Sequence, residues 1–110
     1  MKNECLPNPY AWKYLGTTTG INALTLPSDY TELYVTASCQ GVTFNSIIIK
    51  EITGDQIIVG GYYATTTSGG ANIYGASCSI LKSVTSIRLQ QIFINGTSVT
   101  SDSTLKVYYR

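Results

Sequence analysis

The chain contains no histidine, and only 12% of its 110 residues carry a charge. Without histidine there is no Ser–His or Cys–His nucleophile pair, no His-based acid–base catalysis and no use of the commonest metal ligand. An ordinary domain has about 25% charged residues, and the net charge of +1 is too small for a protein that neutralises nucleic-acid phosphates. We therefore expect no nucleic-acid partner.

Long hydrophobic runs are also absent. The longest aliphatic stretches cover residues 47–49 and 57–59, whereas a membrane-spanning helix needs roughly 20 apolar residues. No apolar segment of signal-peptide length follows Met1 and Lys2. We expect no membrane insertion, no signal peptide and synthesis in the cytoplasm.

Three cysteines form an odd set without Cys-x-x-Cys spacing: Cys5, Cys39 and Cys78. A Cys39–Cys78 disulfide is one interpretation. The other, which a cytoplasmic origin favours, is that both are buried free thiols that act as small apolar side chains.

Thr, Ser, Ile, Tyr and Val dominate what is present, and these residues favour strands. Turn signals recur about every 8–12 residues, which is typical of a sandwich or barrel. The sequence predicts an all-β fold, a two-sheet antiparallel β-sandwich of jelly-roll type with about eight strands. The predicted strands cover residues 10–15, 23–26, 32–39, 42–51, 56–63, 72–81, 86–94 and 104–110.

The loops are predicted from the same signals. Residues 17–20 and 65–70 read as loops, Gly54-Asp55 as a tight turn, and Asn95-Gly96 as a type I′ hairpin turn. Residues 1–9 are predicted to form an extended arm or linker, and residues 10–110 a single domain.

The core is predicted from the apolar phase of the strands. It should contain Leu33, Val35, Ala37, Ile87, Leu89, Phe93, Leu105 and Val107.

Catalytic chemistry finds little support among the residues. Asp29 and Glu32 are close in sequence but lie on a predicted turn, where Asp more often bonds to the backbone than forms a catalytic pair. The lysines Lys50, Lys82 and Lys106 would serve as bases only if buried, and their spacing does not indicate it. We expect no catalytic residue, no metal site and no cofactor.

Aromatic residues are the most informative class, with nine tyrosines and one tryptophan. Tyrosine combines apolar area with a hydroxyl group, which suits recognition surfaces. The predicted ligand site therefore comprises Tyr62, Tyr63, Asn72 and Tyr74, which flank the loop 65–70. The alternatives are tyrosines that only favour strands and a loop that binds nothing. In Tyr108-Tyr109, one side chain should face the core, because neighbours in a strand point to opposite faces.

Two segments resemble a known group of proteins. Residues 12–20 (WKYLGTTTG) and 23–35 (ALTLPSDYTELYV), together with the ending at residues 92–96 and 103–110, are similar to segments of phage tail-fibre and baseplate proteins from phages and prophages of gut Firmicutes. The resemblance implies a C-terminal head or tip domain in the virion. Such domains often form homotrimers, and some bind saccharides or proteins of the host surface.

Two hypotheses of function follow. The first is a non-enzymatic virion structural and adhesion domain that forms a homo-oligomer, with a trimer favoured by the resemblance, and binds a host surface glycan or protein. The alternative is a carbohydrate-binding module of a bacterial secreted enzyme or surface protein. It would use tyrosine and tryptophan rings as a stacking platform.

Overall fold

The computed structural model of the chain describes residues 11–58 and 75–110. The predicted arm over residues 1–9 and the predicted loop over residues 65–70 lie outside these ranges and stay predictions. The described residues form nine strands and one short 3₁₀ helix. These elements are β1 (Lys13–Thr19), β2 (Leu24–Thr25), β3 (Glu32–Cys39), β4 (Val42–Ile49), β5 (Gly54–Ile58), β6 (Ala76–Lys82), β7 (Ser86–Ile94), β8 (Thr97–Ser98), η1 (Thr100–Asp102) and β9 (Thr104–Tyr109).

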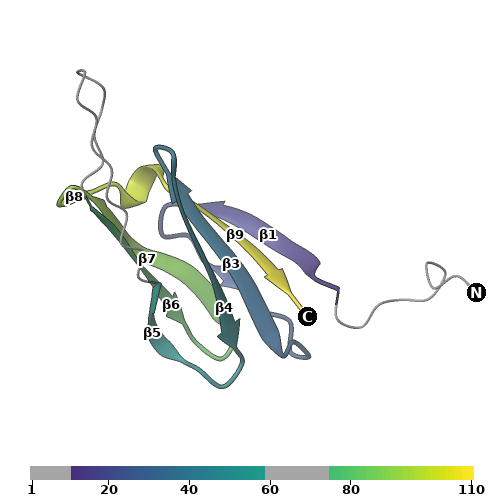
Figure 1. Ribbon diagram of the computed structural model, residues 1–110. Coiled ribbons are helices and arrows are strands. Elements are labelled where there is room, and N and C mark those ends of the chain that lie inside the picture. Colours follow the sequence, from purple (N-terminus) through teal and green to yellow (C-terminus); the bar gives the residue numbers. More distant parts are fainter. Residues whose placement is uncertain (1–10, 59–74) are drawn as a thin grey trace, which may run out of the picture.

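The strands form two antiparallel sheets (Figure 1). The sheet with strand order β1-β9-β3-β4 is called the front sheet below. The back sheet has the order β2-β7-β6-β5, and β8 also pairs with β7. The prediction of an all-β, two-sheet antiparallel sandwich is confirmed, with nine strands where about eight were expected. The first and last strands are neighbours in the front sheet, so the chain returns to where the fold begins.

Two tight turns fix the register of the hairpins. Asn95 and Gly96 have φ angles of 53° and 78°, and Gln40 and Gly41 have φ angles of 50° and 82°. Positive φ at both central residues defines the type I′ turn, whose twist matches that of the strands it joins. The predicted Asn95-Gly96 turn is confirmed, and Gln40-Gly41 closes the hairpin of β3 and β4 in the same way.

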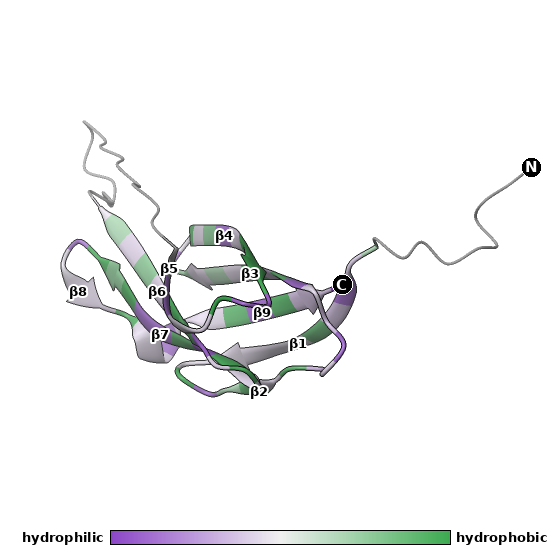
Figure 2. Cartoon of the chain, turned by 90° about the horizontal axis from the view of Figure 1, so that it is seen from below, coloured by the Kyte–Doolittle hydropathy of each residue, from purple (hydrophilic) through white to green (hydrophobic). Residues whose placement is uncertain are grey.

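The core lies between the two sheets (Figure 2), and its residues follow the period of two along the regular stretches of the longer strands. Along β3, for example, Leu33, Val35 and Ala37 are fully buried, and the residues between them are half-buried on the outer face. Of the predicted core residues, the fully buried ones are Leu33, Val35, Ala37, Ile87, Leu89, Leu105 and Val107.

Phe93 is the exception among the predicted core residues. The register of β6 and β7 pairs Ser79 with Gln91 and Ile80 with Leu89, which leaves Gln90 as an extra residue in a β-bulge. A bulge shifts the side-chain alternation by one residue. Beyond it, Ile92 and Ile94 point inward, and Phe93 is half-buried on the other face.

One predicted loop and one predicted turn also prove wrong. Thr17–Thr19, expected in a loop, belongs to β1, because these β-branched residues pair with residues 104–106 of β9. Gly54 and Asp55 begin β5 instead of forming a turn. The chain turns earlier, where the Ile52 N–H donates to the Ile49 carbonyl at 3.2 Å.

Candidate functional site: an aromatic platform

The predicted ligand residues Tyr62, Tyr63, Asn72 and Tyr74 lie outside the described residues, so that site stays a prediction. In the described part of the chain, aromatic side chains gather elsewhere. They lie on the face of the front sheet that points away from the core.

Three tyrosines stand side by side across the front sheet. The strand register pairs Tyr14 of β1 with Tyr108 of β9, and Tyr108 with Tyr34 of β3. Ring centroids are 5.5 Å apart for Tyr14 and Tyr108 and 6.3 Å apart for Tyr34 and Tyr108. All three side chains face outward, because their strand neighbours Leu33 and Val107 are fully buried in the core and alternate side chains share a face.

Trp12 adds a fourth ring beside this row. Its ring centroid lies 5.7 Å from that of Tyr34, and the Arg110 guanidinium carbon lies 4.0 Å from the centroid of the indole. The Arg110 Nε donates to Glu32 Oε1 at 2.8 Å. This ion pair holds the guanidinium over the indole. We call Trp12, Tyr14, Tyr34 and Tyr108 the aromatic platform.

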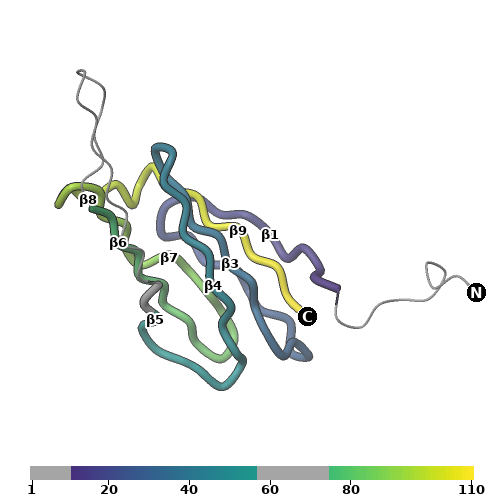
Figure 3. The backbone as a smooth tube through the Cα atoms, viewed as in Figure 1, coloured from purple at the N-terminus to yellow at the C-terminus, as the bar shows by residue number. Residues whose placement is uncertain are grey.

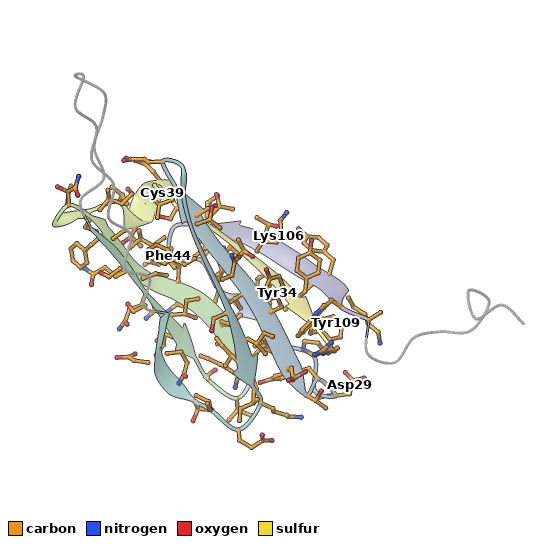
Figure 4. All side chains as sticks on the ribbon, viewed as in Figure 1. Asp29, Tyr34, Cys39, Phe44, Lys106 and Tyr109 are labelled. Carbon is orange, nitrogen blue, oxygen red and sulfur yellow. The ribbon has the colours of Figure 1, made fainter. Side chains whose placement is uncertain are left out.

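A row of polar side chains lies next to the platform along the strands. The register brings together Thr17, Lys106, Thr36 and Asn45. The Thr36 hydroxyl donates to Asn45 Oδ1 at 2.9 Å, and the Tyr14 and Thr17 hydroxyl oxygens are 2.6 Å apart. Figure 4 shows Tyr34 and Lys106 among the side chains of this sheet. The polar row therefore offers hydroxyl, amide and ammonium groups beside the rings.

The platform is open to solvent at both ends. Tyr14 is 59% exposed, and Ile47 of β4, which pairs with Tyr34, is 53% exposed. A ligand ring can stack on the tyrosines and bond to the polar row, with no metal or acid–base pair required.

The two carboxylates considered for catalysis do not face each other as a free pair. The Glu32 carboxylate is bound by Arg110, and Asp29 is exposed in the turn at residues 28 and 29. Within residues 11–58 and 75–110, no group of three His, Cys, Asp or Glu side chains could hold a metal ion. The same residues include no helix that is long and apolar enough to cross a membrane.

Of the three lysines considered as bases, Lys82 is fully buried. Its ammonium group donates to the carbonyl oxygens of Lys50 and Ile52, each at 2.8 Å, and more weakly to that of Ser83 at 3.3 Å. It also lies 5.5 Å from the ring centroid of Tyr30. These partners are backbone carbonyls, not a nucleophile, which gives Lys82 a structural role.

Cys39 and Cys78 are buried free thiols, which agrees with the interpretation favoured from the sequence. Burial raises the pKa of the Cys78 thiol to about 12. Because the thiolate is the reactive form, Cys78 is inert at neutral pH.

Sequence reasoning missed the platform, although part of the signal was present. The alternation in residues 32–39 puts Tyr34 outside, and the prediction that one of Tyr108 and Tyr109 faces the core is confirmed, because Tyr109 packs against it. The missing information was the pairing of β9 between β1 and β3, which joins residues far apart in the sequence.

Comparison with known proteins identifies no relative of this chain. No family model, no curated protein and no solved structure matches it.

Proposed function

We propose that the chain is a non-enzymatic adhesion domain of a phage virion, at the tip of a tail fibre or baseplate, and that it binds a host-surface saccharide on the aromatic platform. The observation that carries the proposal is the row of three tyrosines and Trp12 on an open sheet face. The phage setting, and with it the virion location, rests on the resemblance of residues 12–20, 23–35, 92–96 and 103–110.

Binding would combine stacking with hydrogen bonds. The apolar face of a sugar ring packs on tyrosine rings, and its hydroxyls bond to the groups of the polar row, such as Thr36, Asn45 and Lys106. The cross-strand pairing holds the rings in place before binding, which lowers the entropic cost of association. One domain would bind a short saccharide weakly, so strong adhesion calls for several copies. Homo-oligomerisation is therefore part of the proposal.

The test is a set of single substitutions in the platform. Tyr14→Ala and Tyr34→Ala should each weaken binding to a glycan of the host cell wall by about tenfold, which corresponds to about 1.4 kcal/mol. Tyr34→Phe should retain the stacking and lose less. Ile21→Ala removes an exposed apolar side chain away from the platform and is the matched control. Binding is measured by calorimetry with purified glycans and by adsorption to host cells, on variants shown to be folded by circular dichroism.

Unchanged binding by all platform variants would reject the proposed site. The same series should include Tyr63→Ala and Tyr74→Ala, because the loop 65–70 is the other predicted location. Loss of binding only in these two variants would assign the ligand to the loop.

The second candidate function is a carbohydrate-binding module of a bacterial secreted enzyme or surface protein. The same platform favours it, because stacking on a flat aromatic face does not depend on a virion. The two functions differ in their gene context. Neighbouring genes for phage structural proteins support the first, and a neighbouring glycoside hydrolase supports the second.

A further inference from the structure

We infer that the free edge of β4 is the surface through which two copies of this chain associate, by antiparallel pairing of β4 with β4 of the second copy. The inference deepens the oligomerisation that forms part of the proposed function, and it does not depend on the saccharide site. β4 lies at the end of the front sheet, alongside β3 (Figure 3).

Among the described strands, none pairs with the outer edge of β4, so this edge carries unpaired backbone groups. The two-residue turn makes Cys39 and Val42 a hydrogen-bonded pair, so alternate residues of β4 bond to β3 and those between them do not. The bond from the Lys50 N–H to the Thr31 carbonyl at 3.0 Å continues the same phase. The residues whose N–H and C=O groups point away from β3 are therefore Thr43, Asn45, Ile47 and Ile49. Of these groups, the Ile49 carbonyl already accepts from the Ile52 N–H at 3.2 Å.

The other edges of the described sheets are guarded in ways that prevent strand pairing. β1 has Lys13 and an irregular register between Tyr14 and Gly16. β2 and β8 have two residues each, and β5 carries Asp55. Natural proteins protect free edges with such charges, bulges and short strands.

β4 has none of these guards. Its eight residues, VTFNSIII, include no charge and no proline, and its register with β3 is regular throughout. Ile47 and Ile49 are 53% and 44% exposed on it, and Ile52, in the connection that follows, is 40% exposed. A long edge strand with a regular register and no charge is a template for another strand.

A second copy fits this edge because the strand is complementary to itself. With a two-fold axis at Ser46, Asn45 lies opposite Ile47 of the second copy, and Thr43 lies opposite Ile49. This register pairs the edge-facing residues of β4 and gives about six backbone hydrogen bonds, because the Ile49 carbonyl already accepts from the Ile52 N–H. No like charges meet, because residues 42–49 are all uncharged. Such an isologous contact closes at two copies, whereas the resemblance implies a trimer.

The dimer would join the two front sheets into one continuous sheet. Both aromatic platforms would then lie on the same face, because sheet pairing keeps outward-facing residues on one side. This arrangement presents two saccharide sites to one surface and increases avidity without new contacts.

Disulfide cross-linking tests the register. In a Cys5→Ser background, Ser46→Cys places two thiols opposite each other at a non-hydrogen-bonded pair, about 4.5 Å apart at Cα, which suits a disulfide. Asn45→Cys is the matched control, because its symmetry mate would be more than about 7 Å away. On mild oxidation, Ser46→Cys should form a covalent dimer and Asn45→Cys should not. Equal cross-linking of both variants, or of neither, would overturn the register and the inference with it.

A charge on the edge tests the association itself. By sedimentation velocity, the unmodified chain should form a dimer, and Ile47→Lys should raise the dimer dissociation constant at least tenfold. Val84→Lys introduces the same charge at a 70% exposed residue outside β4 and should change nothing. A monomer or trimer of the unmodified chain, or a dimer insensitive to Ile47→Lys, would contradict the inference. Glycan binding per monomer is measured separately, so a dimer that binds no glycan rejects only the saccharide site.

Discussion

Lys82 gives the sharpest test of how the two sheets are held together. The connection from β4 to β5 crosses from the front sheet to the back sheet, and the buried Lys82 ammonium group binds the carbonyls of Lys50 and Ile52 within it. Lys82→Ala removes these bonds, the contact with the Tyr30 ring and the buried aliphatic stem. We expect this variant to be strongly destabilised.

The magnitude follows from opposing contributions. Hydrogen bonds from a charged donor contribute about 1.5–3 kcal/mol each, and a cation over a desolvated ring adds up to about 2 kcal/mol. Burial of the ammonium group costs several kcal/mol, which the substitution recovers. Loss of the packed aliphatic part of the Lys82 side chain lowers the free energy of unfolding further, as in other large-to-small core substitutions. We expect a net loss of about 3 kcal/mol for Lys82→Ala and about 1 kcal/mol for Lys82→Met, which keeps an unbranched stem.

Urea unfolding followed by far-UV circular dichroism measures these losses. Lys106→Ala, on the outer face of β9, is the matched control and should change the free energy of unfolding by less than about 0.5 kcal/mol. A loss below about 1 kcal/mol for Lys82→Ala would show that the ammonium group does not hold the crossover. A Lys82→Met variant as stable as the unmodified chain would assign the whole effect to the stem.

Other expected outcomes concern the core, the bulge and the buried thiol. Leu105→Ala, at a fully buried residue, should cost about 2–5 kcal/mol in the same unfolding assay, and a loss below about 0.5 kcal/mol would contradict its burial. Deletion of Gln90 removes the bulge and keeps Leu89 inward, so it should cost about 1 kcal/mol, whereas deletion of Arg88 turns Leu89 outward and Gln90 inward and should cost about 3 kcal/mol or more. Equal losses for the two deletions would refute the assigned bulge. The Cys78 thiol has its pKa raised from 9.0 to about 12, so the unfolded chain loses this proton first. Its contribution to stability should be complete below pH 9 and should decline between pH 9 and about 12. A Cys78→Ala variant should lack this part of the decline in unfolding titrations, and identical pH profiles would reject the raised pKa.

Local patterns in the sequence were enough to predict the fold class, and seven of the eight predicted core residues are fully buried. The alternation in β3 and the Asn95-Gly96 turn depend on neighbours within a few residues, so they can be read from a single chain. The bulge at Gln90 could not be read, because it depends on how β7 meets β6. The inward and outward alternation predicted for β7 is therefore wrong at Phe93, the first predicted core residue beyond the bulge.

The prediction of a turn at Gly54-Asp55 was wrong for a related reason. Gly54-Asp55 has the composition of a tight turn, and Gly54 does adopt a positive φ of 97°. The chain nevertheless turns earlier, because Lys82, about thirty residues away in sequence, binds the carbonyls of Lys50 and Ile52. Tertiary hydrogen bonds here override local turn propensity.

The aromatic platform depends both on local alternation along the strands and on the order of the strands in the sheet. That Tyr34 and Tyr108 face outward follows from local alternation. That they stand beside each other depends on strand order, in which β9 inserts between β1 and β3. A surface assembled from residues 12, 14, 34 and 108 thus forms only when β1, β9 and β3 meet in one sheet.

The few charges of the chain are placed so that the front sheet stays nearly neutral. Its four strands contain only Lys13, Glu32 and Lys106, and the first two lie at strand ends. Glu32 is compensated by Arg110, which leaves Lys106 as the one charged side chain in the middle of the strands of this sheet. Long-range attraction of a charged ligand is correspondingly weak. The proposed recognition on this face would therefore depend on ring stacking, hydrogen bonds and strand pairing, which act only at contact.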